Sequence, residues 1–333
     1  MNDTFLAGMR SLALLCPFPI LGIRRLALLC AFLVGALASG LASLEAGAQE
    51  TTPRTRLVLL GTGTPNADPE RSGPATAIIV DDRAYLVDAG AGVVRRAAKA
   101  ARDHGIPALR VQRLHHVFLT HLHSDHTVGL PDLLLSPWVL DRPVPLNVYG
   151  PPGTKKMMDG IIEAWSADIN VRIDGPEPRD ANRDAYRALT TEIEPGLVYE
   201  DDLVKVYAIL VDHGGWQQPV GYRFVGPDRT IVISGDARPS ESIVDACSGC
   251  DILVHEVYSA ERFTTRAPAW QQYHSRFHTS TVELADIANR SGAGLVVLYH
   301  QLFWGTDDEG LVREIRAAGY SGPLVSGKDL DVY

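Results

Sequence analysis

Cysteine and lysine are both scarce in this sequence of 333 residues, which contains four cysteines and five lysines. Structural zinc sites usually draw on clustered cysteines, and the sequence offers no such cluster, so we exclude a site of that kind. Acidic residues outnumber basic residues 40 to 31, and the formal net charge is −9. A protein that holds a long polyanion is expected to carry the opposite field. The charge therefore predicts no nucleic-acid partner.

The first 48 residues have the order of a secretory signal peptide. Arg24 and Arg25 precede an apolar run at 26–38, which is too short for a membrane-spanning helix. Ala46-Gly47-Ala48 then offers a cleavage site before Gln49. Removal of this segment, whose net charge is +1, leaves a chain of charge −10. We therefore expect residues 49–333 to form one periplasmic or secreted domain with no stable membrane insertion, although retention of the segment as an anchor stays open.

Cys247 and Cys250 are the two cysteines of the predicted domain, in the run Cys-Ser-Gly-Cys. In an exported protein this spacing favours a local disulfide. A thioredoxin-like redox pair fits less well, because the motif does not open a helix after a first strand.

Apolar strands interleaved with helices make up the rest of the chain. We expect strands at 56–60, 75–80, 84–87, 114–120, 146–149, 203–211, 220–225, 230–233, 252–255 and 295–299. We expect helices at 93–102, 129–135, 154–165, 241–246, 281–290 and 307–318. Residues 167–184 are polar, bear proline and arginine, and predict a loop or arm. This pattern is typical of two sheets packed together and covered by helices.

Three histidines and one aspartate occur within six residues, as HLHSDH at positions 121–126. An apolar strand precedes them and a short amphipathic helix follows, so they lie on a strand-to-helix turn. His121 and His123 point the same way on an extended chain, and Asp125 and His126 fall where the chain turns. Imidazole and carboxylate are ligands that zinc and related metals accept. The turn therefore predicts a metal site.

Three further candidates, His213, Asp236 and His300, each follow an apolar strand. With the first four residues they make five histidines and two aspartates. Such a set can hold two metal ions with one carboxylate bridging them.

The His-x-His-x-Asp-His turn resembles the signature of the metallo-β-lactamase superfamily. The order of the later residues is similar to the phosphodiesterase branch, which includes ribonuclease Z and the zinc-dependent alkyl- and arylsulfatases. The resemblance covers nearly all of residues 49–333. It implies an α/β protein with a single αββα sandwich domain and two zinc ions, with manganese or iron as alternatives.

The resemblance also implies a role for each ligand. One metal is held by His121, His123 and His213, the other by Asp125, His126 and His300, and Asp236 bridges them. Asp88 matches an acidic residue that orients ligands, with a turn or cap aspartate as the alternative.

His278, in the run His-Thr-Ser-Thr, matches a histidine that lies over the scissile group. By the same resemblance, Glu256 holds its tautomer. A histidine held in this way can protonate a departing oxygen, and a buried polar pair under a loop is the alternative.

The function that we expect is an exported dinuclear zinc hydrolase that cleaves small sulfate or phosphate esters. A metal-bridging hydroxide attacks in line, Asp125 helps to orient it, and His278, oriented by Glu256, protonates the leaving oxygen. The export segment, the acidic charge and the lack of a clear Gly/Pro-rich basic arm at 167–184 weigh against tRNA. A small-molecule ester is the expected partner, and a homodimer stays open.

Three other functions remain as alternatives. They are a ribonuclease Z-like tRNA 3′ endonuclease, a lactonase, and a metal-binding protein that has no turnover or carries a single redox iron. The metal content and a panel of chromogenic substrates would separate them.

The signal peptide is tested by the mature N-terminus. We expect cleavage after Ala48, because the small-residue site follows the apolar run at the usual spacing. N-terminal sequencing of protein taken from the cell envelope should begin at Gln49. A full-length product found in the cytoplasm would contradict this prediction.

Overall fold

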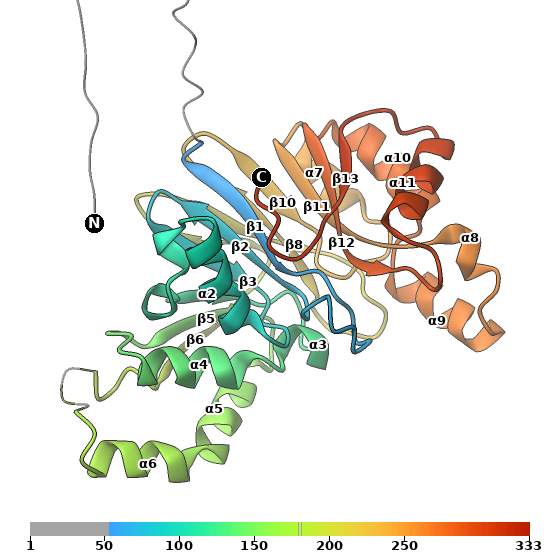
Figure 1. The fold of residues 1–333 in the computed structure, drawn as a ribbon. Helices are drawn as coiled ribbons and strands as arrows, with labels where there is room; N and C mark the ends of the chain where they lie inside the picture. Colours follow the sequence, from blue (N-terminus) through green and yellow to red (C-terminus); the bar gives the residue numbers. More distant parts are fainter. Residues whose placement is uncertain (1–52, 179, 181) are drawn as a thin grey trace, which may run out of the picture. The chain divides into compact units, whose positions relative to one another are not determined.

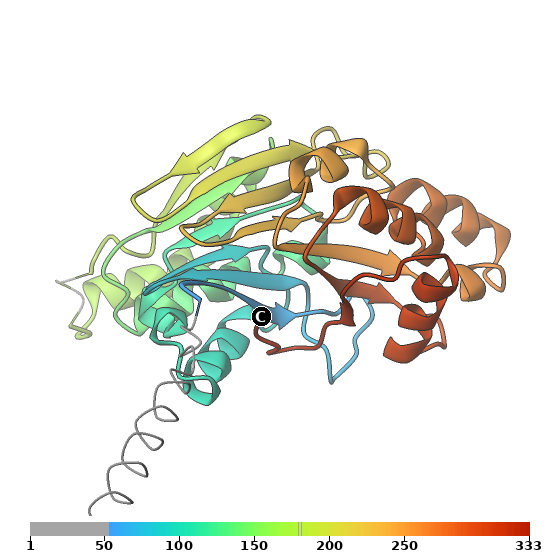
Figure 2. The same ribbon diagram turned by 90° about the horizontal axis from the view of Figure 1, so that it is seen from above.

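Two β-sheets packed face to face form the centre of the molecule (Figures 1 and 2). This computed structural model describes residues 53–333 except 179 and 181, so the predicted signal peptide lies outside the described residues. The first sheet contains, in spatial order, β1 (Thr55–Gly61), β2 (Ala75–Val80), β3 (Arg83–Val87), β4 (His116–Phe118), β5 (Leu146–Gly150) and β6 (Ala188–Glu192). The second contains β13 (Leu324–Ser326), β12 (Leu295–Leu302), β11 (Ile252–Tyr258), β10 (Thr230–Ile233), β9 (Val220–Val225), β8 (Lys205–Leu210) and β7 (Gly196–Glu200).

Helices cover the outer face of each sheet (Figure 1). The first half of the chain contributes α2 (Val93–Asp103), α3 (Ser124–Thr127), α4 (Leu130–Val139), α5 (Thr154–Ala164), α6 (Ser166–Asp174) and two short 3₁₀ turns, η1 (Pro107–Leu109) and η2 (Val111–Arg113). The second half contributes α7 (Glu241–Cys247), α8 (Ala260–Phe263), α9 (Pro268–Phe277), α10 (Thr281–Ser291) and α11 (Asp308–Ala317). No helix of the described residues is long and apolar enough to cross a membrane.

The two-residue period of the strands divides the apolar side chains among three layers. In β1, Leu57 and Leu59 point between the sheets, whereas Val58 and Leu60 point outward beneath α2 and α4. A third cluster lies between the second sheet and α7, α10 and α11. The layers are therefore helix, sheet, sheet and helix, which confirms the predicted αββα sandwich.

The sequence prediction missed several elements. Residues 166–174 form helix α6, and this corrects the predicted loop or arm at 167–184. Ile169 and Ile173 lie four residues apart and face the core, and Arg172 pairs with Asp168 across one turn. Because most other residues of this segment are polar, these few apolar positions did not indicate a helix. The short strands β6 and β7 and the helices α8 and α9 were also not predicted.

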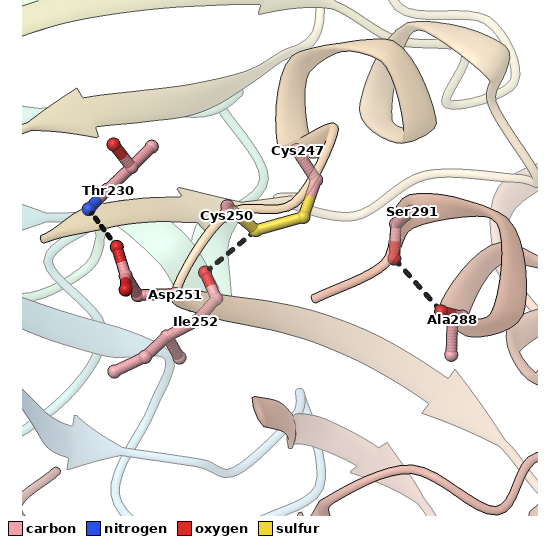
Figure 3. Close-up of a disulfide and its surroundings, with 7 residues drawn as sticks. All are labelled: Thr230, Cys247, Cys250, Asp251, Ile252, Ala288 and Ser291. Carbon is pink, nitrogen blue, oxygen red and sulfur yellow. Dashed lines mark hydrogen bonds between the residues drawn. A yellow bond between two sulfur atoms is a disulfide. The ribbon is translucent and has the colours of Figure 1, made fainter. Parts of the chain in front are cut away.

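The Cys247–Cys250 disulfide joins the end of α7 to the start of β11 (Figure 3), which confirms the local bridge predicted from the spacing. Both sulfur-bearing side chains are buried. Ser248 and Gly249 between them have φ of 37° and 82°, so the chain turns tightly through the left-handed region.

Helix α4 continues past Pro137, beyond the predicted end at residue 135. Proline has no N–H, so the carbonyl of Leu133 loses its usual donor. Arg142, which is fully buried, replaces it: Nη1 donates to Leu133 O (2.9 Å), and Nη2 donates to Leu134 O (2.9 Å) and Ala185 O (2.8 Å). Burial lowers the pKa of Arg142 to about 10.

Replacement of Arg142 by alanine tests this support. We expect Arg142→Ala to lower the free energy of unfolding by about 3 kcal/mol, because several buried carbonyls lose a charged donor. Urea unfolding provides the measurement. Arg187→Ala, which removes an exposed arginine paired with Asp184, is the control and should change stability by less than about 0.5 kcal/mol. A similar small effect for Arg142→Ala would show that the carbonyls find other partners.

Candidate metal centre

The His-x-His-x-Asp-His turn is held in place from below by Asp88, which follows β3. One carboxylate oxygen of Asp88 accepts hydrogen bonds from Thr120 N (2.8 Å) and Thr120 Oγ1 (3.1 Å), and the other accepts from His126 Nδ1 (2.8 Å). Asp88 has φ of 63°, an uncommon conformation that directs its carboxylate under the turn. Asp88 therefore orients the His126 ring, with Nδ1 turned toward the Asp88 carboxylate and Nε2 toward Asp236.

Close backbone packing brings the turn onto this support. A Cβ at Gly129 would lie 2.3 Å from Gly90 O, so only glycine allows the two segments to meet. From the second sheet, Val220 N donates to Thr120 O (2.9 Å) and the Tyr222 hydroxyl donates to Leu119 O (2.8 Å). Both sheets therefore position the same turn.

A first group of ligand-type atoms belongs to His121, His123, His213 and Asp236, all within 4.8 Å of one another. His123 Nδ1 lies 2.9 Å from His121 Nε2 and 3.1 Å from His213 Nε2. The Nδ1 atoms of His121 and His213 are engaged elsewhere, by Thr120 Oγ1 (3.0 Å) and Phe277 O (2.7 Å). Their Nε2 lone pairs are thus turned toward a common point.

A second group consists of Asp125, His126 and His300, also within 4.8 Å of one another. Asp236 lies between the two groups: Oδ1 is 3.4 Å from His126 Nε2, and Oδ2 is 3.4 Å from His300 Nε2. The structure therefore brings all seven predicted ligands together, with Asp236 placed between the two groups. Asp236, His278 and His300 form a third group, whose ligand-type atoms also lie within 4.8 Å of one another.

His300 reaches the site through an irregularity in β12. The register between β11 and β12 pairs Glu256 with Tyr299 and Val257 with Gln301, so His300 is an extra residue with φ of 44°. The strand continues to Leu302, whereas the sequence predicted its end at residue 299. A bulge of this kind redirects a side chain out of the regular alternation.

Burial and charge set the protonation states. Burial lowers the pKa of His121 well below its usual value and that of His213 to about 4, so both imidazoles are neutral. Burial opposes the charged form of His126 as well, but the carboxylates of Asp236 and Asp88 outweigh it and hold its pKa well above the usual value. Likewise burial opposes ionisation of Asp236, yet His300 and His126 keep its pKa well below the usual range.

The residues present fit a metal. Within the described part of the chain, His126 Nε2, His300 Nδ1 and Asp236 Oδ1 are buried and have no hydrogen-bond partner. Unpaired buried polar atoms are unfavourable, and a cation at this point would satisfy His126 and Asp236. Imidazole and carboxylate are also the ligand types that zinc accepts.

Glu256 and His278 lie beside the second group. Glu256 Oε1 accepts from Thr279 N (2.8 Å), and Oε2 lies 3.4 Å from His278 Nδ1. The last distance is longer than a standard hydrogen bond, but such contacts often tighten when substrate binds. Burial raises the pKa of Glu256 well above its usual value and lowers that of His278 to about 4.

The sequence interpretation missed two contributors. The indole Nε1 of Trp216 lies 3.0 Å from His123 Nε2, and its position three residues after His213 was the only signal in the sequence. Helix α9, which ends at Phe277 directly before His278, was not predicted at all. His116 packs against Tyr85 and Tyr199 and belongs to neither group of ligand-type residues.

The placement of Asp236 predicts the effect of removing it. We expect Asp236→Ala to bind fewer than two metal ions per chain and to lose activity, because Asp236 belongs to the first group and also contacts His126 and His300 of the second. Native mass spectrometry and elemental analysis measure the metal content. The matched control is Asp245→Ala, which removes an exposed aspartate on α7 and should keep the full metal content. Two retained metals and normal turnover in Asp236→Ala would refute the bridging assignment.

The family described as "Beta-lactamase superfamily domain" matches residues 83–301. Ribonuclease Z of Mycobacterium bovis (strain BCG / Pasteur 1173P2) is 34% identical over 286 residues, which cover 82% of this chain and 96% of that protein. Ribonuclease Z of Mycobacterium marinum (strain ATCC BAA-535 / M) is 32% identical with the same coverage.

Solved structures agree on the fold. The metallo-beta-lactamase fold protein YhfI from Bacillus subtilis superposes with a TM-score of 0.65 at 17% identity, covering 85% of this chain and 100% of that one. The short form of human tRNase Z gives 0.60 at 21% identity, covering 84% and 98%. At these identities the likeness concerns the fold alone.

Two expectations from the sequence are corrected by these relatives. A hydrolase of small sulfate or phosphate esters and the absence of a nucleic-acid partner were both wrong, because the relatives matched over nearly their whole length are named Ribonuclease Z. The net charge led to the wrong expectation because it sums the charges of the side chains and leaves out any bound metal ion. A bound divalent cation is often the largest local charge in a site and reverses the local field.

The family match spans well over half of the chain, and the ribonuclease Z relatives exceed 30% identity across most of it. The chain therefore belongs to the metallo-β-lactamase superfamily and, within it, to the ribonuclease Z family.

Proposed function

We propose that this protein is a metal-dependent endoribonuclease of the ribonuclease Z type, which cleaves a phosphodiester bond at the 3′ end of tRNA. The observation that carries the proposal is the 34% identity that extends over 96% of a ribonuclease Z. The His and Asp groups of the site supply the chemistry that such a reaction needs, and no part of the proposal depends on a small ester substrate.

Two zinc ions are the proposed cofactors. One would be held by His121, His123 and His213, the other by Asp125, His126 and His300, with Asp236 shared. Metals bound in this way supply Lewis-acid stabilisation for the oxygens that attack and leave the phosphorus.

Asp125 and Asp88 have different proposed roles. Asp125 Oδ2 lies 3.3 Å from His300 Nε2, and Asp125 also lines the cavity that opens on the site. Its carboxylate can therefore orient an attacking water. Asp88 is buried beneath the turn, where it accepts hydrogen bonds from Thr120 and His126, so it acts as a positioning residue.

Glu256 and His278 together hold the proton for the leaving oxygen. Burial favours the neutral forms of both groups, so the resting pair consists of a carboxylic acid beside an imidazole. A scissile phosphate near His278 adds negative charge and favours the imidazolium. The proton then moves from Glu256 to His278 Nδ1, and Nε2–H donates to the departing oxygen.

Export remains a separate proposal, since no described residue tests it. If residues 1–48 direct export, the RNA that this enzyme meets lies outside the cytoplasm. The position of the mature N-terminus tests export, whereas assays of the purified protein test the ribonuclease activity. Either proposal can therefore fail without the other.

A tRNA that carries a 3′ extension tests the function and the role of His278 together. We expect the zinc-loaded protein to cut this RNA once near its 3′ end. His278→Ala should slow that cleavage by about 10²-fold, because an alkoxide leaves poorly without a proton donor. The same variant should hydrolyse bis(4-nitrophenyl) phosphate at nearly the normal rate, because nitrophenolate leaves unaided.

Two results would contradict the proposal. Absence of any cut in the extended tRNA, by a protein that holds two zinc ions, would exclude the ribonuclease function. Equal slowing of both substrates by His278→Ala would remove His278 as the acid, and loss of zinc in that variant would make His278 a ligand. Glu256→Gln should show the same selectivity more weakly, since it acts through His278.

A further inference from the structure

A cavity of about 350 Å³ opens directly on the metal centre. One wall consists of ligand-type residues, among them Asp125, His278 and His300. A second part of the lining, which we call the aromatic wall, is formed by Arg266, Trp270, Tyr273, His274 and Trp304. The volume is within the range of small-molecule sites, and a wall of rings beside a phosphodiester site is suited to a nucleobase.

Trp304 is held in a strained conformation. Its φ is 49°, next to Gly305 with φ of 99°, in a turn closed by a hydrogen bond from Thr306 N to Phe303 O (3.1 Å). Left-handed backbone is unfavourable for a bulky residue, and such outliers concentrate at ligand sites.

The neighbours of Trp304 keep its ring in place. The ring centroid lies 4.6 Å from that of His274 and 5.3 Å from that of Tyr258. The guanidinium carbon of Arg266 lies 5.2 Å from the Trp304 centroid. A ring that is already fixed loses little conformational entropy when a ligand stacks against the same wall.

Unpaired polar atoms in the aromatic wall give a second, independent indication. His274 is 7% exposed, and its Nδ1 has no hydrogen-bond partner among the described residues. The same holds for Nε of Arg266, a half-buried side chain. Leaving such atoms unpaired is unfavourable, and the edge of a nucleobase offers both donors and acceptors.

Helix α9 connects the aromatic wall to the proton donor. His274 lies one turn before His278, whose backbone N–H donates to His274 O (2.9 Å), and the two rings are 5.5 Å apart. An oxygen that receives the proton from His278 therefore lies next to the aromatic wall.

We propose that the aromatic wall is a subsite for the base of the nucleotide whose oxygen leaves during cleavage. The assignment rests on the proposed ribonuclease function. Because every base has a π-face, stacking on this wall tolerates any base. Cleavage would thereby favour nucleotide substrates over simple phosphodiesters without reading a sequence.

Calorimetric titration of the zinc-loaded full chain tests the subsite without any turnover. The probes are adenosine 3′-monophosphate and ribose 3-phosphate, which share the phosphate and the sugar and differ in the base. We expect the nucleotide to bind about 10- to 100-fold more tightly, which is the range of one base–aromatic stack. Trp304→Ala should reduce this ratio to near one, and Trp304→Phe should retain most of it.

Trp165→Ala is the matched control, because Trp165 is 42% exposed and lies between α5 and α6, outside the cavity lining. It should leave the ratio unchanged. If Trp304→Ala does not fold, Trp270→Ala replaces it: Trp270 is 52% exposed in the aromatic wall, and its loss should lower the ratio several-fold.

Equal affinity for the two probes, undetectable binding of the nucleotide, or an undiminished ratio in the aromatic-wall variants would overturn the proposal. Failure of the ribonuclease function looks different. The extended tRNA would then remain uncut while the base-dependent difference in binding persisted.

Discussion

Crowding of five imidazoles and two carboxylates at the junction of two sheets is the constraint on which the rest of the structure depends. Five of these seven side chains are buried, and part of their hydrogen-bonding capacity finds no partner among the described residues. Such an arrangement is unfavourable unless cations neutralise the carboxylates and occupy the imidazole lone pairs. The site is thus suited to binding metal, and much of the neighbouring structure serves to orient it.

The support for this site comes from both sheets and from unusual backbone. Asp88 and His300 each have positive φ, and His300 owes its direction to a bulge in β12. These conformations persist because the surrounding packing holds them. Val220 and Tyr222 of the second sheet donate hydrogen bonds to the segment that leads into the His-x-His-x-Asp-His turn. These bonds fix the ligand-type residues of one sheet relative to those of the other.

The two walls of the cavity come from different kinds of structure. The ends of strands and the His-x-His-x-Asp-His turn provide the ligand-type residues of the cavity, and the two sheets fix their positions. Helix α9 and the turn at Trp304 provide the aromatic wall on longer connecting segments. Binding residues are commonly found on such segments, which a rigid scaffold positions. The net charge of the chain says little about this cavity, because a field is local and bound metals would dominate it.

The sequence alone determined the layered fold and the identity of the ligand-type residues. Apolar strands that each end in histidine or aspartate indicate which side chains meet at one edge, and HLHSDH at 121–126 has few alternative explanations. The local Cys247–Cys250 bridge followed from spacing in the same way. These are short-range patterns, so no tertiary information was needed.

Only the tertiary structure showed how the parts act together. It turned His300 into the site through a bulge, placed Trp216 on His123, formed α6 and α9 from weakly patterned residues, and set the aromatic wall against the ligands. Register shifts and contacts between distant segments depend on packing across the whole domain. Periodicity along the chain carries no record of them, and for that reason the sequence identified the ligand-type residues but not the cavity beside them.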